Sequence, residues 1–320
     1  MIKTIFQRIM QLIPILLIVA TIVFVITRMI PGNPAATILG PQAPKEAVEA
    51  LTIELGLDKS IPEQYMNYMT DALRGDFGKS YHYNQPVMEL ILERFPNTVI
   101  LTVISLAIAT VVAIPIGIVS ATKQYSIFDY ISMVFALFGV SMPIFWLGLM
   151  LVLIFSVNLG WLPSFGMGNI ENGIWDVVSH LILPCICLAT IPSATFARIT
   201  RSSMLEVIGQ DYIKSLRSKG LKEKVVIWKH GLKNALPPIV TVMGLQISTS
   251  LAGAILTETI FSWPGMGRMI VDAIENRDYA LIQGSVLFIA FLFVFVNLVI
   301  DIVYLYINPK VDYSGDRGGK

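Results

Sequence analysis

Few side chains in this sequence have the types and spacing that a chemical step would need. Gly78-Lys79-Ser80 matches the end of a phosphate-binding loop, but the glycine required five residues before Gly78 is replaced by Leu73. The three histidines are scattered without metal-ligand spacing, so we expect surface or packing roles for them. They are His82, His180 and His230. The sequence therefore predicts no nucleotide site, no metal site and no catalytic centre in this chain.

The two cysteines, Cys185 and Cys187, lie two positions apart in an apolar run. Neighbours at this spacing on a helix point to different sides, so we expect no disulfide between them and assign both to the core. An enzyme acting inside a membrane would need a nucleophile or a metal set at that depth, and the two thiols and Asp301 do not form one by spacing. The sequence thus disfavours an intramembrane enzyme.

Three polar side chains, Glu258, Asn297 and Asp301, interrupt apolar runs near the C-terminal end of the chain. An ionisable residue in a membrane span faces a cavity, a subunit interface or a structural partner, because hydrocarbon does not solvate it. For Asp301 we favour a structural partner near the cytoplasmic boundary. For Glu258, near the outer end of its run, a gate residue and a structural residue both remain open.

The composition behind these residues is that of an integral membrane protein. Hydrophobic residues make up 55% of the chain, charged residues only 14%, and the mean hydropathy is +0.70. The net charge of +1 argues against a nucleic-acid-binding protein, which would carry a strong basic excess.

Six apolar runs are long enough, at about 1.5 Å per residue, to cross roughly 30 Å of hydrocarbon as helices. They cover residues 9–27, 98–120, 131–157, 180–197, 239–260 and 284–307. We interpret the first as a transmembrane helix and not as a cleaved signal peptide, because it is too long and no small-residue cleavage site follows it. Pro115, Pro143 and Pro184 interrupt their spans, which is tolerated when neighbouring helices or water satisfy the freed carbonyls. Most such prolines are packing kinks, and the rest line a path.

The polar insert at residues 30–97 predicts two short helices, at 44–55 and 62–73, followed by a turn or extended chain at GDFGKSY. It contains five Lys or Arg against nine Asp or Glu, whereas residues 198–233 contain nine against three. Positive charge is retained on the cytoplasmic side. The insert is therefore predicted to lie outside the cell membrane and the basic segment inside it, with both termini in the cytoplasm.

The basic segment at residues 198–238 contains two amphipathic patterns. Leu205, Ile208, Tyr212 and Leu216 recur at steps of three and four, which predicts one apolar helix face. Gly220 follows a last turn with Arg217 and Lys219, which is typical of a left-handed helix cap.

A second pattern of Val225, Trp228, Leu232 and Leu236 predicts another short helix, which Pro237-Pro238 should end. Two interpretations stay open for the pair of helices. They could lie on anionic lipid, as amphipathic basic helices do. Alternatively, they could form a lever that docks in a groove on a soluble partner.

The connection between the last two runs begins with a turn at 263–267 and continues as an amphipathic helix. Its pattern fits an outward-facing gate or an ordinary surface connection equally well. An inverted internal repeat, which a secondary transporter would be expected to show, is not convincing in this sequence.

Four stretches resemble the permease subunits of the dipeptide, oligopeptide and nickel class of binding-protein-dependent ABC importers. They read QLIPILLIVATIVFVITRMIPGNPA, LGLDKSIPEQY through RGDFGKSY, GQDYIKSLRSKGL with KHGLKNALPP, and TETIFSWPGMGRMIVDAI through NLVIDIVYLYINP. Gly220 matches the glycine of the cytoplasmic loop named for its EAA consensus, although Lys214, Ser215 and Leu216 occupy the EAA positions.

The resemblance implies an all-α membrane protein with six transmembrane helices of type I ABC importer architecture and a small extracytoplasmic insert between the first two. It implies four parts: residues 1–29, the insert 30–97, a permease core 98–308 with a coupling loop at about 198–238, and a cytoplasmic tail 309–320. Such a chain lies in the bacterial inner membrane as a multi-pass protein.

The same resemblance implies a transport subunit that is not an enzyme and has no cofactor of its own. Its expected partners are a second homologous permease, one or two cytoplasmic ATPases that bind ATP and Mg²⁺, an extracytoplasmic solute-binding protein and membrane lipid, and no nucleic acid. Peptides are the expected solute, and nickel, metal-opine complexes or glutathione are the alternatives.

Two groups of site residues follow from the resemblance and the patterns together. The ATPase-coupling residues are expected to be Leu205, Ile208, Gly209, Asp211, Tyr212, Leu216 and Gly220. The residues of the translocation path or gate are expected to be Glu258, Trp263 and Pro264.

The charge distribution makes a prediction about topology. A reporter enzyme that is active only in the cytoplasm should work when fused near Lys222 and fail when fused near Lys59, because the basic segment stays inside. Fusion activity in intact cells measures this, and the reverse pattern would contradict the arrangement of six spans.

Overall fold

The computed structural model describes residues 2–29, 32–40 and 42–307, so the predicted tail at 309–320 lies outside the described residues. The described chain is almost entirely helical and forms two compact units. The insert unit comprises residues 2–98 and 264–295, and the bundle unit comprises residues 99–263 and the chain from 296 onward. The boundaries predicted for the four parts of the chain stay predictions.

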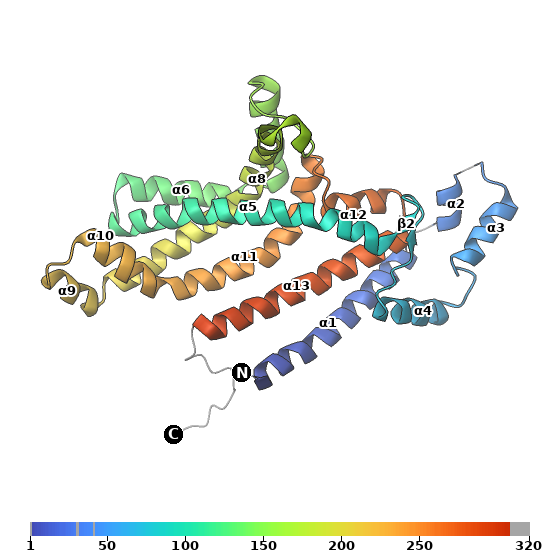
Figure 1. Cartoon of the computed structure of the whole chain (residues 1–320), viewed down its shortest axis with the longest axis horizontal. Helices are drawn as coiled ribbons and strands as arrows, with labels where there is room; N and C mark the ends of the chain where they lie inside the picture. The colour runs from blue at the N-terminus through green and yellow to red at the C-terminus, as the bar shows by residue number, and fades with distance from the viewer. Residues whose placement is uncertain (1, 30–31, 41, 308–320) are drawn as a thin grey trace. The chain divides into compact units, whose positions relative to one another are not determined.

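Three helices are long and apolar enough to cross a membrane in the described part of the chain (Figure 1). They are α5 (Val87–Thr122), α8 (Ile174–Ile208) and α13 (Tyr279–Ile307), with Tyr279–Ile300 as the tested part of α13. They contain the predicted spans at 98–120, 180–197 and 284–307. The first predicted span lies in α1 (Ile2–Met29), whose apolar part, Ile13–Met29, is shorter.

The predicted span at 131–157 consists of two helices that meet at 105°, and the interruption predicted at Pro143 is confirmed. α6 (Ile127–Ser141) ends before Met142, which is extended, and α7 (Ile144–Leu151) starts after Pro143 and continues as a π-helix, η1 (Val152–Asn158). Proline disfavours a helical conformation in the residue before it and has no N–H to continue the ladder. Pro143 therefore separates two helices, whereas Pro115 and Pro184 lie inside the long helices α5 and α8.

The fifth predicted span lies in α11 (Leu232–Ile260), which belongs to a second bent pair, Glu223–Leu251 and Gly253–Ile260, at 48°. When each bent pair is counted as one span, the described chain has up to five, and α1 corresponds to the remaining predicted span.

In the bundle unit, α8 packs against both α6 and α11. A cluster of buried small and aromatic side chains from α5 and α8, with Phe196 fully buried, fills the space between these helices. Gly117 of α5 lies very close to α8: a Cβ there would lie 2.6 Å from Thr200 Cβ and 2.7 Å from the Ala197 carbonyl oxygen. Only glycine fits such a contact without a shift of backbone.

A buried ion pair holds α6 to α8 in the same unit. Asp129 is 2% exposed, and it accepts two hydrogen bonds from Arg201, from Nε at 2.6 Å and from Nη2 at 2.7 Å. The backbone N–H of Tyr125 donates a third bond to the same carboxylate at 3.0 Å. The bidentate geometry fixes the start of α6 to the last turns of α8.

In the insert unit, the predicted helices at 44–55 and 62–73 are confirmed as α3 (Lys45–Glu54) and α4 (Ile61–Leu73). The predicted turn or extended stretch is a short antiparallel pair, β1 (Lys79–Ser80) and β2 (Gln85–Pro86). The prediction missed α2 (Pro34–Leu39), whose start has a recognisable signal. Asn33 Oδ1 accepts from Ala35 N at 2.9 Å, and Pro34 occupies the first helical position.

The core of the insert unit joins the first turns of α5 to α12 (Met266–Glu275) and to the start of α13, with Val87, Ile91 and Leu281 fully buried. Asp278, 2% exposed, accepts from Ser80 Oγ at 2.5 Å and from Leu281 N at 3.1 Å. The buried carboxylate thus has partners, and it ties β1 to the start of α13.

Candidate functional site

The basic segment at residues 198–238 contains more helical elements than the two helices that the sequence predicted. A single helix through residues 205–216 is wrong, because α8 ends at Ile208 and α9 (Asp211–Ser218) begins after Gly209 and the extended Gln210. Glycine is a poor helix former, and Asp211 supplies an acid for the first turn of a new helix. The break separates Leu205 and Ile208 on α8 from Tyr212 and Leu216 on α9.

The predicted apolar face is not an open docking surface. Leu205, Ile208, Tyr212 and Leu216 are all partly buried, and they pack against the buried cluster of the bundle unit that contains Ile213. Spacing shows which residues share a face, but it does not show what covers that face. Here the chain's own core covers much of it.

Ile213 is the anchor that the sequence interpretation missed. It is fully buried and sits in one cluster with Met204 of α8, Val226 and Ile239. Its position directly after Tyr212 places it off the predicted stripe, and its β-branched apolar side chain between polar neighbours was the available signal. α9 is thus fixed to the helices on both sides of it.

The predicted left-handed cap at Gly220 is confirmed, with φ at +78°. Gly220 N donates to Arg217 O at 2.9 Å, and Leu221 N donates to Leu216 O at 3.4 Å. These two bonds form the Schellman arrangement, in which the last carbonyls of a helix are satisfied by the residues that leave it. A Cβ at Gly220 would meet no atom within 4 Å, so the backbone conformation, and not space, selects glycine here.

Two side-chain contacts complete the turn after α9. Arg217 donates to both oxygens of Glu223, from Nε at 3.1 Å and from Nη2 at 2.7 Å, and this carboxylate raises the pKa of Arg217. Both side chains are largely exposed, so the pair contributes little stability and mainly sets geometry. Asn234 Nδ2 donates to the Tyr212 hydroxyl at 2.8 Å and ties α9 to α11.

The prediction that Pro237-Pro238 ends the second helix is wrong. α10 (Glu223–Val225) leads into a π-helix, η3 (Val226–Gly231), and then into α11, which continues through both prolines. The adjacent Ala235 and Ile239 are buried in the bundle core. Packing on both sides of the prolines keeps the helix together although two backbone donors are missing.

The side of α9 that the core leaves exposed is polar. Asp211, Lys214, Ser215 and Ser218 are exposed, with Lys214 Nζ 2.9 Å from Asp211 Oδ1. Gly209 and Gly220 are exposed at the two ends of α9. A partner that contacts α9 from outside would therefore meet hydrogen-bonding groups and a short ion pair.

Two of the three predicted gate residues lie together. Glu258 and Trp263 are both fully buried in the bundle unit, and Trp263 N donates to the Glu258 backbone oxygen at 2.8 Å. The Trp263 ring packs in a cluster with Leu101 and Leu188. The burial is compatible with a closed gate and with a structural role alike, so both assignments stay predictions.

Pro264 belongs to the insert unit, where its carbonyl oxygen accepts from Asn97 Nδ2 at 2.8 Å. The predicted turn and amphipathic helix after it are confirmed. α12 starts beyond Gly265 and buries Met266, Met269 and Ile270.

The two cysteines are free and buried, each on a different cluster of the bundle unit. Among the described residues, no group of three or more His, Cys, Asp or Glu side chains could hold a metal ion.

Comparison with known proteins gives one consistent family. Residues 113–313 match the family described as binding-protein-dependent transport system inner membrane component, and residues 1–102 match the N-terminal family of the same membrane components.

Relatives match over nearly the full chain. The dipeptide transport system permease protein DppB of Alkalihalophilus pseudofirmus is 48% identical over 96% of this chain and 98% of its own length. The protein of the same name from Escherichia coli K12 is 43% identical over 98% of this chain and all of its own length. The glutathione transport system permease protein GsiC of Escherichia coli K12 is 41% identical with the same coverage.

The fold is similar to that of a solved structure of the MetNI methionine ABC transporter in an inward-facing conformation. The match has a TM-score of 0.55 at 19% identity and covers 69% of this chain and 97% of that chain. At this identity the likeness shows the fold alone.

The geometry of α9 predicts the accessibility of single thiols in the isolated chain. Lys214→Cys should react quickly with a water-soluble maleimide, because position 214 is exposed. Ile213→Cys should react only after denaturation, because Ile213 is fully buried. The wild-type chain is the control, since both native thiols are buried. Equal labelling of the two variants by mass spectrometry would contradict this packing of α9.

Proposed function

The chain belongs to the family of inner-membrane components of binding-protein-dependent transport systems, and its fold is that of type I ABC importer permeases; from this premise we propose that it forms half of the pathway through which short peptides are imported. The relatives support the solute class. Two are named for dipeptide transport and one for transport of glutathione, which is itself a small peptide. Free dipeptides are the first candidate and glutathione is the second.

The proposed assembly pairs this chain with a second permease, with cytoplasmic ATPases that bind ATP and Mg²⁺, and with an extracytoplasmic solute-binding protein. In the proposed topology the polar insert and the turn before α12 face outward. The basic segment with α9, and both termini, face the cytoplasm, which the distribution of Lys and Arg supports.

Within this assembly, α9 is the proposed contact for an ATPase. Its exposed polar side, with Asp211, and its glycine-bounded ends at Gly209 and Gly220 would meet the ATPase. Tyr212 and Leu216 on its inner side, together with Leu205 and Ile208 at the end of α8, would pass the movement to α8 and α11, since those side chains pack on the bundle core.

The contacts around α9 support a rigid transmission of that movement. The buried Ile213, the bond between Asn234 and Tyr212, and the Schellman turn at Gly220 leave α9 little freedom to move on its own. When ATP binding brings the ATPases together, α9 would carry the ends of α8 and α11 with it, as in a rigid-body transition. Of the proposed gate residues, Glu258 lies in the last turn of α11 and Trp263 and Pro264 follow its end in the sequence.

Uptake by cells tests the proposed solute class. A strain that lacks this chain should lose most of its uptake of radiolabelled dialanine, and the wild-type gene on a plasmid should restore it. Glutathione taken up in the same cells tests the second candidate. If the restored strain assembles the complex and still takes up neither peptide, short peptides are not the solute.

The cap after α9 predicts how coupling depends on backbone geometry. Gly220→Val places a β-branched residue at φ +78°, which strains the cap by about 1 kcal/mol or more and misaligns α9. We expect the variant to insert and to pair with the second permease. In reconstituted vesicles its dialanine uptake should fall several-fold, and its ATP hydrolysis should no longer respond to the loaded binding protein.

Gly160→Val is the matched control, because Gly160 also has a positive φ, +62°, and open space around it, but lies far from α9 in the sequence. It should keep uptake and hydrolysis coupled. Full coupling in Gly220→Val would show that α9 is not the coupling element, and an interfacial role on lipid would then explain the segment better.

A further inference from the structure

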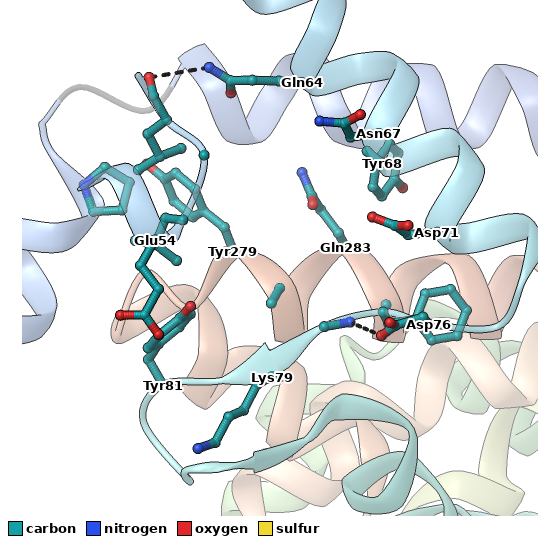
Figure 2. A pocket seen from close by; sticks show the side chains of 18 of the residues that line it. Glu54, Gln64, Asn67, Tyr68, Asp71, Asp76, Lys79, Tyr81, Tyr279 and Gln283 are labelled. Atoms are coloured by element: carbon teal, nitrogen blue, oxygen red, sulfur yellow. Dashed lines mark hydrogen bonds between the residues drawn. The ribbon is translucent and has the colours of Figure 1, made fainter. Parts of the chain in front are cut away.

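A polar cavity of about 340 Å³ lies inside the insert unit. Its wall comes from the end of α1, from α4 and β1, and from the start of α13, as Figure 2 shows in part. The volume lies in the range of sites for small ligands. None of the residues proposed for coupling or for the gate lines it.

The charges on this wall are balanced. Three cationic side chains, Arg28, Lys79 and Arg277, and three carboxylates, Glu54, Asp71 and Asp76, line the cavity. A site for a simple anion or cation would show an excess of one sign. A balanced wall suits a ligand that carries both a positive and a negative group.

Arg28 is held in a fixed orientation on one side of the cavity. Its Nε donates to Gln64 Oε1 at 2.8 Å, and its guanidinium lies 5.0 Å from the centre of the Phe24 ring and 5.8 Å from that of Tyr279. Gln64 is itself fixed, because its Nε2 donates to the Lys59 carbonyl at 2.8 Å. A planar guanidinium held in this way is prepared to bind a carboxylate through its outer nitrogens.

The α4 wall presents unused hydrogen-bonding groups. Figure 2 shows Asn67, Tyr68 and Asp71 on the α4 side, facing Gln283 of α13. The Tyr68 hydroxyl is buried and has no hydrogen-bond partner among the residues that the structure describes, and burial raises its pKa, so the hydroxyl stays protonated. A buried hydroxyl without a partner is unfavourable, which indicates that a ligand group completes it.

The carboxylates of the wall are not equivalent. Asp76 Oδ1 accepts from Gly78 N at 2.9 Å and so serves the turn before β1. No hydrogen bond or ion pair reaches the Asp71 carboxylate within the described residues. Glu54 also has no such partner in that part of the chain, but Figure 2 shows it beside Tyr81, whereas Asp71 lies on α4 with Asn67 and Tyr68. Asp71 is therefore the carboxylate placed next to the groups that could bind the rest of the ligand.

We propose that this cavity binds a short peptide with free termini, with its ammonium group at Asp71 and its carboxylate at Arg28. The amide of Asn67 and the Tyr68 hydroxyl offer donors and acceptors for the peptide bond between the termini, and Gln283, whose Nε2 donates to Thr27 Oγ1 at 2.7 Å, offers its amide oxygen. A zwitterionic lipid headgroup shares the two charges but has no peptide bond to use these groups. The peptide class rests on the proposed function, whereas the site is separate from the proposed pathway.

The test measures peptide binding to the full chain, assembled with its permease and ATPase partners in nanodiscs and without the soluble binding protein. The ligands are dialanine, N-acetyl-dialanine, dialanine amide and glycerophosphoethanolamine. The key variants are Asp71→Asn and Tyr68→Phe, and Arg28→Lys keeps the charge but removes the planar fork. Asp58→Asn is the matched control, because Asp58 is an exposed carboxylate of the same insert that does not line the cavity.

Asp71→Asn should raise the Kd for dialanine roughly tenfold or more and leave the weaker binding of N-acetyl-dialanine almost unchanged, since only the free ammonium needs the carboxylate. Arg28→Lys should weaken dialanine binding but not binding of the amide. Tyr68→Phe should weaken all three peptides by a few-fold. Asp58→Asn should bind as the wild type does.

Wild-type affinity for dialanine in both Asp71→Asn and Tyr68→Phe overturns the proposal. So does competition by glycerophosphoethanolamine at lower concentration than dialanine, which would assign the cavity to lipid. If cells still take up dialanine in either case, the proposed function stands and only this site falls. If the assembled wild-type complex neither binds nor transports dialanine, both fall.

Discussion

The constraint on which this structure depends is that hydrocarbon offers no partner for a backbone N–H or C=O. The chain meets it with long helices that satisfy their own backbone groups, and it allows irregular backbone only where side chains or neighbouring helices compensate. The break before Pro143, the π-helices η1 and η3 and the two prolines inside α11 are all next to packed helices of the bundle unit.

The existence of the long helices could be predicted from the sequence, because an uninterrupted apolar run leaves few alternatives in a membrane. The number of separate helices into which the apolar runs are divided was harder to predict. Pro143 breaks one span by 105°, whereas Pro237 and Pro238 lie inside a continuous helix, although all three remove a backbone donor. The difference comes from what packs beside each proline, such as the buried Ala235 and Ile239, and a single sequence does not contain that information.

The candidate site was likewise predictable from the sequence only in part. The cap at Gly220 was predictable, since its conformation is set by local backbone chemistry. The role of the apolar stripe on α9 was not, because periodicity is the same for a face that awaits a partner and a face that already has one. The anchor Ile213 and the bond from Asn234 to Tyr212 join residues that the sequence pattern treats separately. The insert cavity was also beyond prediction, because Arg28, Asp71 and Gln283 come from three distant stretches.

The close approach at Gly117 limits how the bundle can move. With Thr200 and the Ala197 carbonyl where a side chain would be, α5 and α8 interlock at one point. If α8 slid along α5 by one turn, about 5.4 Å, a position with a side chain would have to occupy that gap. Axial slippage is therefore blocked and tilting about the contact is allowed, so the glycine acts as a pivot. If the end of α8 that leads to α9 moved sideways, the opposite end of α8 would swing in the other direction, with an amplitude set by the lengths of helix on either side of Thr200.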